Sequence, residues 1–234
     1  MTERWVQAWG QAHSALSFFY YPSCSKTFRM VVDSPIQGRR IRLELSNECA
    51  KNALCSLLTP AQREHLCKYC VHTTWRKGQE LSVPLLEKKA VLIQNGLFAC
   101  MTSVQQTKVR TTNLYIAGDF LSYFAFGPED TAPFYPGIIT CVKDSSTIQF
   151  PLEILRNIFM ENPKVAKYML ETSNHQLLRT QLYLHFVLQQ DAYDAMTYLL
   201  DFCKKHKVPR LTYDELAKIS NLHRVTVTRA MKEI

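Results

Sequence analysis

The last twenty-four residues of the chain constrain its fold more than any other segment. They read LTYDELAKISNLHRVTVTRAMKEI, with apolar positions at helical spacing on both sides of a short turn. Asn221 stands at that turn, where a residue that tolerates positive φ is needed. The positions expected to be buried are Leu216 and Ile219 before the turn, Leu222 beneath it, and Val227, Ala230 and Met231 after it. This pattern is typical of a helix-turn-helix, although an ordinary helical hairpin with a solvated polar face would share it.

The segment resembles the DNA-binding motif of the CRP/FNR family of bacterial transcription regulators. In that family the recognition helix is similar to Arg-Glu-Thr-Val-Ser-Arg, and here the matching positions read Arg-Val-Thr-Val-Thr-Arg from Arg224 to Arg229. The chain departs from the family at Asn221, where glycine is usual, and at Val225, where glutamate is common. The resemblance implies that the second helix enters the DNA major groove, and that DNA is contacted by His223, Arg224, Val225, Thr226, Thr228 and Arg229.

Charge and composition fit this expectation. The 234 residues are 47% hydrophobic and 21% charged, which suits a globular protein of one or two domains. The net charge is +8, and from Cys203 onward eight Lys or Arg face only three acids. Such a surface suits phosphate binding, although a solubilising tail would share it. No run of eighteen apolar residues exists and no signal-peptide core stands at the start, so we expect a cytoplasmic protein with no membrane partner.

The middle of the chain, residues 56–160, has the pattern of a mostly β domain. Thr59 and Pro60 predict the cap and first position of a short helix over residues 61–69. Short β-branched or aromatic runs follow, separated by glycine and proline. The expected strands are residues 70–75, 90–93, 97–104, 108–116, 138–142 and 146–150. So many short strands indicate a sandwich or barrel.

The family resemblance extends weakly into this region. Lys77-Gly78, the stretch ending at Gly96, and Ala117-Gly118-Asp119-Phe120 are similar to turns of the family's β-roll sensor domain, but a glycine expected near residue 85 is missing. The implied fold class is α+β: a jelly-roll-like β-roll sensor, a long dimerisation helix, and a helix-turn-helix that lacks its wing, because the chain stops inside the expected recognition helix. We therefore expect an N-terminal extension (1–55), a sensor (56–160), a dimerisation helix (161–188) and an incomplete DNA-binding domain (189–234).

A leucine stripe marks the long helix that Pro163 should open. Leu170, Leu177 and Leu184 lie one heptad apart, and Leu178, Leu182 and Phe186 widen the stripe. Such a stripe can pair with its twin or pack on the chain's own β domain. The long helix of the resembled family is its dimer interface, so the resemblance favours a homodimer.

The effector cannot be named from the sequence, but cyclic AMP is disfavoured. A buried cyclic phosphate needs a guanidinium partner, and no arginine occurs between Arg110 and Arg156. A small organic effector fits the apolar and aromatic segment better, with Leu121, Tyr123 and Phe124 as candidate pocket residues. For most aromatic residues in this segment, a plain core is the better interpretation.

Cysteines leave an iron–sulfur cluster or a thiol sensor open. Cys49 and Cys55 match part of the spacing in oxygen-sensing family members, but Ser46 stands where a further cysteine would be. Cys67 and Cys70 form a C-x-x-C, a weak signal because buried structural cysteines are common. Haem, with His65 or His72 as ligand, is a weaker alternative.

Taken together, the sequence predicts a homodimeric transcription regulator of the CRP/FNR type rather than an enzyme. Its expected partners are an A/T-rich palindromic DNA duplex and, for an activator, RNA polymerase. The alternative is a ligand-binding or enzymatic β domain with an incidental helical tail. No G-x-S-x-G, P-loop or H-E-x-x-H motif supports an enzyme.

Overall fold

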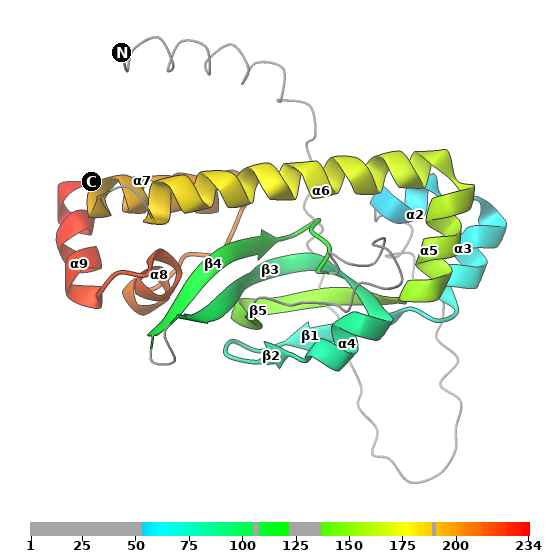
Figure 1. The fold of residues 1–234 in the computed structure, drawn as a ribbon, viewed down its shortest axis with the longest axis horizontal. Coiled ribbons are helices and arrows are strands. Elements are labelled where there is room, and N and C mark those ends of the chain that lie inside the picture. Colours follow the sequence, from blue (N-terminus) through cyan, green and yellow to red (C-terminus); the bar gives the residue numbers. More distant parts are fainter. Residues whose placement is uncertain (1–52, 105–107, 122–136, 189–190) are drawn as a thin grey trace, which may run out of the picture. The chain divides into compact units, whose positions relative to one another are not determined.

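The computed structural model describes residues 53–104, 108–121, 137–188 and 191–234, all within the compact unit Leu43–Ile234. Of the predicted site residues, Cys49, Tyr123 and Phe124 lie outside these ranges. Figure 1 shows helices at both ends and along one side of an antiparallel sheet. The helices are α2 (Ala53–Leu57), α3 (Pro60–Cys67), α4 (Val83–Lys88), α5 (Leu152–Glu161), α6 (Pro163–Tyr183), α7 (Ala192–Lys205), α8 (Tyr213–Ser220) and α9 (Arg224–Glu233).

The sheet has the strand order β1-β5-β3-β4, and β2 pairs with the beginning of β5. Its strands are β1 (Val71–Trp75), β2 (Glu80–Leu81), β3 (Lys89–Val104), β4 (Lys108–Ile116) and β5 (Ile138–Pro151). Successive side chains of a strand point to opposite faces. Leu97 and Ala99 of β3 accordingly join the core shared with the C-terminal helices, whereas Phe98 and Cys100 join the core on the other face. Both faces of the central strands are therefore buried.

Two pairs of predicted strands are each one longer strand. Residues 90–93 and 97–104 both belong to β3, and residues 138–142 and 146–150 both belong to β5. The predicted break at Gly96 is a bulge, because the β3–β5 register shifts there and the strand continues. Gly96 has φ +94°, and a Cβ at this position would collide with the side chain of Ser145. The glycine thus allows two backbones to approach, rather than a turn to form.

The predicted helices are confirmed, but three elements were missed. Thr59 caps α3 in a full capping box with Gln62, and Pro60 begins the helix. The prediction lacked α2, β2 and α4, which have five, two and six residues. Helix α4 occupies the region near residue 85 where the glycine turn was expected. Elements this short carry too little periodicity to be seen in a sequence.

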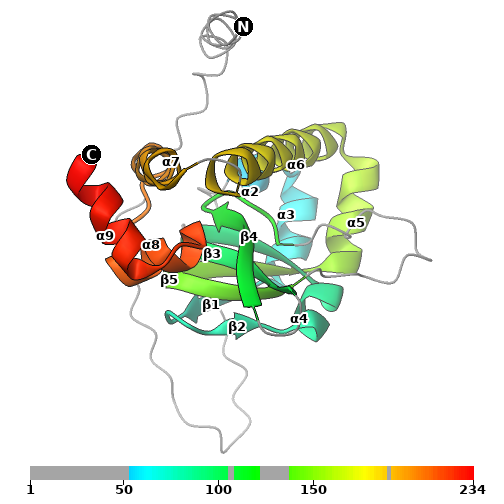
Figure 2. The same cartoon turned by 60° about the vertical axis from the view of Figure 1, so that its left-hand side comes forward.

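Helix α6 buries one face and leaves Leu170, Leu177 and Leu178 of the leucine stripe exposed, whereas Leu184 packs partly buried against the chain's own core. Figures 1 and 2 show it running along the sheet beside β4, and Thr180 Oγ1 donates to Asn113 Oδ1 of β4 at 2.9 Å. Leu170 and Leu177 are each 57% exposed, so this part of the stripe does not pack on the chain's own sheet. The buried face consists of Val165, Met169, Gln176 and Tyr183. The helix continues into a π-helical turn, η2 (Leu184–Leu188).

A buried ion pair joins the Gly118–Asp119 turn to α6. Arg179 Nη2 donates to Asp119 Oδ1, and the backbone N–H of Ile116 donates to Asp119 Oδ2 at 2.9 Å. The side chains of Asp119 and Arg179 are only 3% and 18% exposed. Burial raises the pKa of Asp119, and the neighbouring guanidinium opposes that rise. None of the described helices is both long and apolar enough to cross a membrane.

We predict that Asp119→Asn lowers the free energy of unfolding by about 3 kcal/mol, because it leaves the Arg179 guanidinium buried without its counter-charge. Urea denaturation followed by circular dichroism measures this change. Glu171→Gln, which breaks the exposed 3.9 Å pair with Lys167, is the control and should have a much smaller effect. Equal effects of the two variants would contradict a structural role for the buried pair.

Candidate nucleic-acid interface

Helices α8 and α9 meet at a left-handed turn, as the sequence predicts. Asn221 has φ 60° and ψ 20° and ends α8, and Thr212 begins that helix in a capping box with Glu215. The predicted core positions Leu216, Ile219, Val227 and Ala230 are all buried, and Leu222 and Met231 pack partly buried against them. The segment is therefore a helix-turn-helix with its apolar side sealed against the rest of the chain.

The predicted DNA-facing residues lie on the outer side of α9. His223 is the N-cap residue, and its side chain makes no capping hydrogen bond. Val225 is 62% exposed, and Arg229 is also exposed. Thr226 and Thr228 are half-buried on the flanks, and Thr228 Oγ1 donates to the carbonyl of Arg224 at 2.9 Å. The outward face thus presents two guanidinium groups, an aliphatic side chain and the open N-terminus of a helix.

Arg224 is not an isolated cation. Its Nε lies 3.3 Å from Asp214 Oδ1, and both side chains are more than two-thirds exposed. An exposed pair of this kind is weak and exchanges readily. A phosphate or guanine can therefore displace Asp214 at small cost.

The turn between the helices is hydrogen-bonded to the edge strand of the sheet. Asn221 Oδ1 accepts from the backbone N–H of Thr111 at 2.7 Å, and Asn221 Nδ2 donates to the Thr111 carbonyl at 2.9 Å. Thr111 Oγ1 donates to the Lys218 carbonyl at 3.0 Å. The Tyr183 hydroxyl lies 2.7 Å from the Ile219 carbonyl and 3.1 Å from that of Thr111. The side-chain amide of Asn221 therefore pairs with the backbone of the edge strand as a neighbouring strand would.

A second attachment is electrostatic. Glu215 is 3% exposed, and its carboxylate oxygens each lie 2.8 Å from a lysine nitrogen, Lys77 beside β2 and Lys143 of β5. The backbone N–H of Thr212 also donates to this carboxylate, at 2.7 Å. Burial alone raises the pKa of Glu215, but the hydrogen bonds from Lys143, Lys77 and Thr212 outweigh it and lower the pKa to about 2. The charged form is thus the one that holds α8 to the sheet.

Sequence reasoning missed the residues of both attachments. The Thr212–Glu215 capping box has a local signature, a threonine followed three residues later by glutamate. The partners Lys77, Lys143 and Thr111 are distant in sequence, so no spacing points to them. Asn221 was singled out for its backbone conformation alone, and its amide contacts were not foreseen.

The remaining predicted site residues that the structure describes, Cys55, Cys67, Cys70 and Leu121, are buried. Cys67 and Cys70 are buried in the apolar cluster formed with Leu66 and Phe150, and Cys55 is also buried. Within the described ranges, no group of three or more His, Cys, Asp or Glu is arranged to hold a metal ion. Leu121 is fully buried, in the core on the face of the sheet opposite the C-terminal helices.

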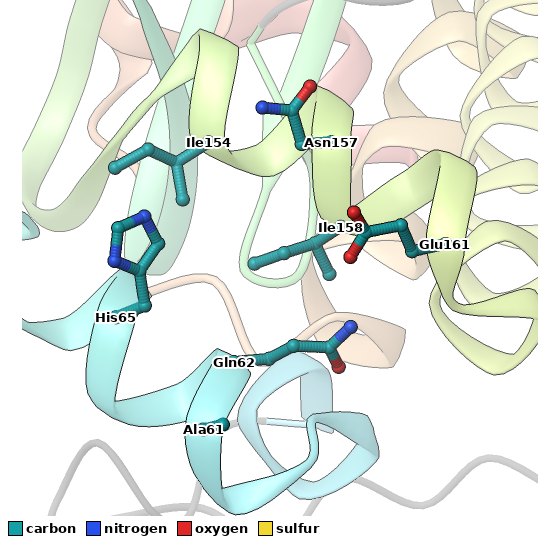
Figure 3. Close-up of a pocket in the computed structure, with 7 residues that line it drawn as sticks. All are labelled: Ala61, Gln62, His65, Ile154, Asn157, Ile158 and Glu161. Carbon is teal, nitrogen blue, oxygen red and sulfur yellow. The ribbon is translucent and has the colours of Figure 1, made fainter.

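A shallow cleft of about 310 Å³ separates α3 from α5. Figure 3 shows His65 and Gln62 on one side, with Ile154, Asn157 and Glu161 on the other. Gln62 is already used by the fold, because its Oε1 accepts from the backbone of Thr59 and from the side chain of Asn162. His65 packs edge-on against Tyr69. We assign no function to this cleft.

The attachment through Glu215 should depend on pH with a defined sign. The pKa of Glu215 falls from an ordinary 4.5 to about 2 on folding. The contribution of its charge to folding stability is therefore complete above pH 4.5 and is lost as the pH drops toward 2. Glu215→Gln keeps an acceptor for Thr212 but removes the charge. The stability difference between wild type and this variant, from urea denaturation, should therefore be constant above about pH 5 and shrink below it.

Asp214→Asn is the matched control, because the exposed Asp214 carboxylate is not buried among lysines. Its stability curve should stay parallel to that of the wild type across the same pH range. A constant difference between Glu215→Gln and wild type down to about pH 2 would contradict the assignment of the charged form.

No family model and no curated protein matches the sequence, but many solved structures share the fold. They include FixK2 from Bradyrhizobium japonicum, with 16% identity and a TM-score of 0.55 over 70% of this chain and 83% of that one. A putative transcriptional regulator of the crp/fnr family from Eubacterium rectale has 15% identity and a TM-score of 0.57, over 78% and 86%. The c-di-GMP responsive global regulator CLP from Xanthomonas campestris has 14% identity and a TM-score of 0.57, over 75% and 91%. The chain therefore has the α+β fold of the CRP/FNR transcription regulators.

Proposed function

We propose that the protein is a sequence-specific DNA-binding transcription regulator of the CRP/FNR type. The observation that carries this proposal is the outer face of α9, where Val225 and Arg229 are exposed beside the uncapped N-terminus of the helix. In a helix-turn-helix, the N-terminal part of the second helix contacts base edges in the major groove. Such a protein acts where the DNA is, so we expect it in the cytoplasm.

The contrary reading, an enzyme or ligand-binding β domain with an incidental helical tail, finds less support. Strand residues Leu97 and Leu114 share one apolar core with Val227 and Ala230 of α9. An incidental tail would not complete the core of the domain to which it is attached.

Cyclic AMP is disfavoured as the controlling signal in this proposal. A cyclic phosphate requires a guanidinium partner, and the sequence between Arg110 and Arg156 contains none. A small organic effector remains the favoured signal. Thiol oxidation or an iron–sulfur cluster is less supported, because Cys55, Cys67 and Cys70 are buried and buried cysteines are commonly structural.

We further propose that the active form is a homodimer paired through α6. Leu170 and Leu177 are each 57% exposed and Leu178 is 37% exposed, on a helix of 21 residues. Leucines at heptad spacing on an open helix face are the pattern of a two-helix seam. Pairing would place two copies of α9 to read a palindromic site, with RNA polymerase as a further partner for an activator.

Val225 should set one base preference. Its methyl groups can contact a thymine methyl, whereas a glutamate there would accept a hydrogen bond from cytosine N4. A site selection with the wild type should therefore yield A/T-rich half-sites with thymine facing Val225. Val225→Glu should shift that one position to a C·G pair, with a discrimination of about 1 kcal/mol.

Arg229→Ala is the companion variant and should weaken binding to every selected duplex, because Arg229 lies at the centre of the outward face. Lys88→Ala, on α4 at the other end of the sheet, is the control and should bind as the wild type does. An unchanged selected sequence for Val225→Glu would show that α9 does not dock in the major groove in this way.

Leu177→Glu should convert the dimer into a monomer, because pairing would bury two like charges at the same level of the seam. Light scattering at several protein concentrations measures the mass. Met160→Glu places the same charge on another exposed apolar residue, outside α6, and should leave the dimer intact. A dimeric Leu177→Glu would place the interface elsewhere.

A further inference from the structure

A groove of about 390 Å³ lies where the edge of the sheet meets the helix-turn-helix. Its strand side is formed by Val109 and Arg110 of β4, and its helical side by Lys218, Asn221, His223 and Thr226. The groove thus runs along one flank of α9, next to the face proposed to read bases. It shares His223 and Thr226 with the predicted DNA-facing residues, but its strand residues have no part in the function argued so far.

We infer that this groove binds a phosphate of the DNA backbone, with Arg110 of the sensor sheet as its principal contact. The inference rests on the proposed function, since its ligand is the same duplex that α9 reads. It assigns a DNA contact to the sheet, far in sequence from the helix-turn-helix. Recognition would then require both parts of the chain to face the DNA together.

The first support is charge. Arg110 and Lys218 are exposed, no acidic side chain lines the groove, and within the described residues neither cation is in an ion pair. Three other cations near the helix-turn-helix are matched by acidic side chains. Lys77 and Lys143 meet Glu215, and Arg224 meets Asp214. A cationic groove among matched pairs suits an external anion.

The second support is the end of α9. His223 is the N-cap of this ten-residue helix and lines the groove, yet its side chain does not cap the helix. The first backbone N–H groups of a helix lack intrahelical acceptors, and the helix dipole makes this end electropositive. The helix end and the Arg110 guanidinium therefore favour the same kind of ligand from two sides of one groove.

The third support is rigidity. Two hydrogen bonds, at 2.7 and 2.9 Å, hold the turn residue Asn221 against Thr111, which directly follows Arg110. The Thr111 hydroxyl also donates to the Lys218 carbonyl. Arg110 therefore keeps a fixed place beside the N-terminus of α9 while the two parts stay attached. A backbone that is already fixed lowers the ordering cost when a phosphate binds.

The fourth support is the shape of the duplex. The major groove is about 12 Å wide, so a helix lying in it has a phosphate backbone along each flank. Thr226 lines the flank of α9 that faces the cationic groove. A backbone passing that flank meets the threonine hydroxyl, the lysine and the arginine, which are the side chains that usually bind phosphate.

The test is DNA binding by fluorescence anisotropy on a selected duplex, at salt concentrations from about 50 to about 200 mM. Each phosphate contact contributes about 0.9 to the slope of log K against log salt, and a dimer carries two copies of Arg110. Arg110→Ala should therefore reduce the slope by about 1.8. The ratio of wild-type to variant affinity should fall about 12-fold across that range.

Controls separate this contact from general charge and from folding. Arg110→Lys keeps a phosphate-binding charge and should retain most of the slope, whereas Lys88→Ala on α4 should not change it. Urea denaturation confirms that Arg110→Ala is folded, and selection should give it the wild-type sequence, because a phosphate contact carries no base preference. Ethylation interference should show one phosphate per half-site at which the wild type is blocked and Arg110→Ala is not.

The outcomes distinguish the phosphate site from the proposed DNA-binding function on which it rests. A wild type that binds no duplex overturns the proposed function, and the phosphate site with it. A wild type that binds DNA while Arg110→Ala shows the same slope overturns the phosphate site alone. Equal loss of slope in Lys88→Ala would also overturn it, because the effect would then reflect net charge. If acidic peptides bound the groove through Arg110, and Arg110→Ala left the salt slope of DNA binding unchanged, the groove would bind a protein partner instead.

Discussion

The hydroxyl of Tyr183 is the point at which the three parts of this molecule meet. Tyr183 ends α6, is 1% exposed, and lies within hydrogen-bonding distance of the carbonyls of Ile219 in α8 and Thr111 in β4. A phenol has one proton, so it donates to one carbonyl at a time, and the 2.7 Å contact to Ile219 is the shorter. Burial raises the pKa of this hydroxyl, so it stays a donor.

This junction explains how a change in the sensor could reach the DNA-facing helix in the function we propose. Asp119 is tied to Arg179 of α6, and α6 leads within four residues to Tyr183 and then into the π-helical turn η2. Single π-helical turns are frequent at functional sites. A shift of α6 would therefore act on Thr111 and Ile219 together, and move the helix-turn-helix relative to the sheet.

Sequence and structure agree where information is local and differ where it is not. The cap at Thr59 and the left-handed turn at Asn221 depend on a few neighbouring residues, and both were predicted. The capping box at Thr212 also has a local signature, but it was missed. Gly96 was interpreted as a turn because its role depends on Ser145, which lies on a strand distant in sequence. The lysines that neutralise Glu215 could not be predicted for the same reason. The surface of α9 could be predicted from periodicity, but its attachment to β4 could not.

The charges of this region fall into two classes that ionic strength treats differently. Glu215 is 3% exposed and directly paired with Lys143, which is 19% exposed, so salt screens their attraction little. Arg110, Lys218 and Arg229 are exposed, and salt screens them strongly. In the function we propose, raising the salt would therefore weaken attraction to DNA before it loosens α8 from the sheet. The protein would leave DNA with α8 and α9 still attached to the sheet, because the cations that hold the fold together are not those proposed to face the phosphates.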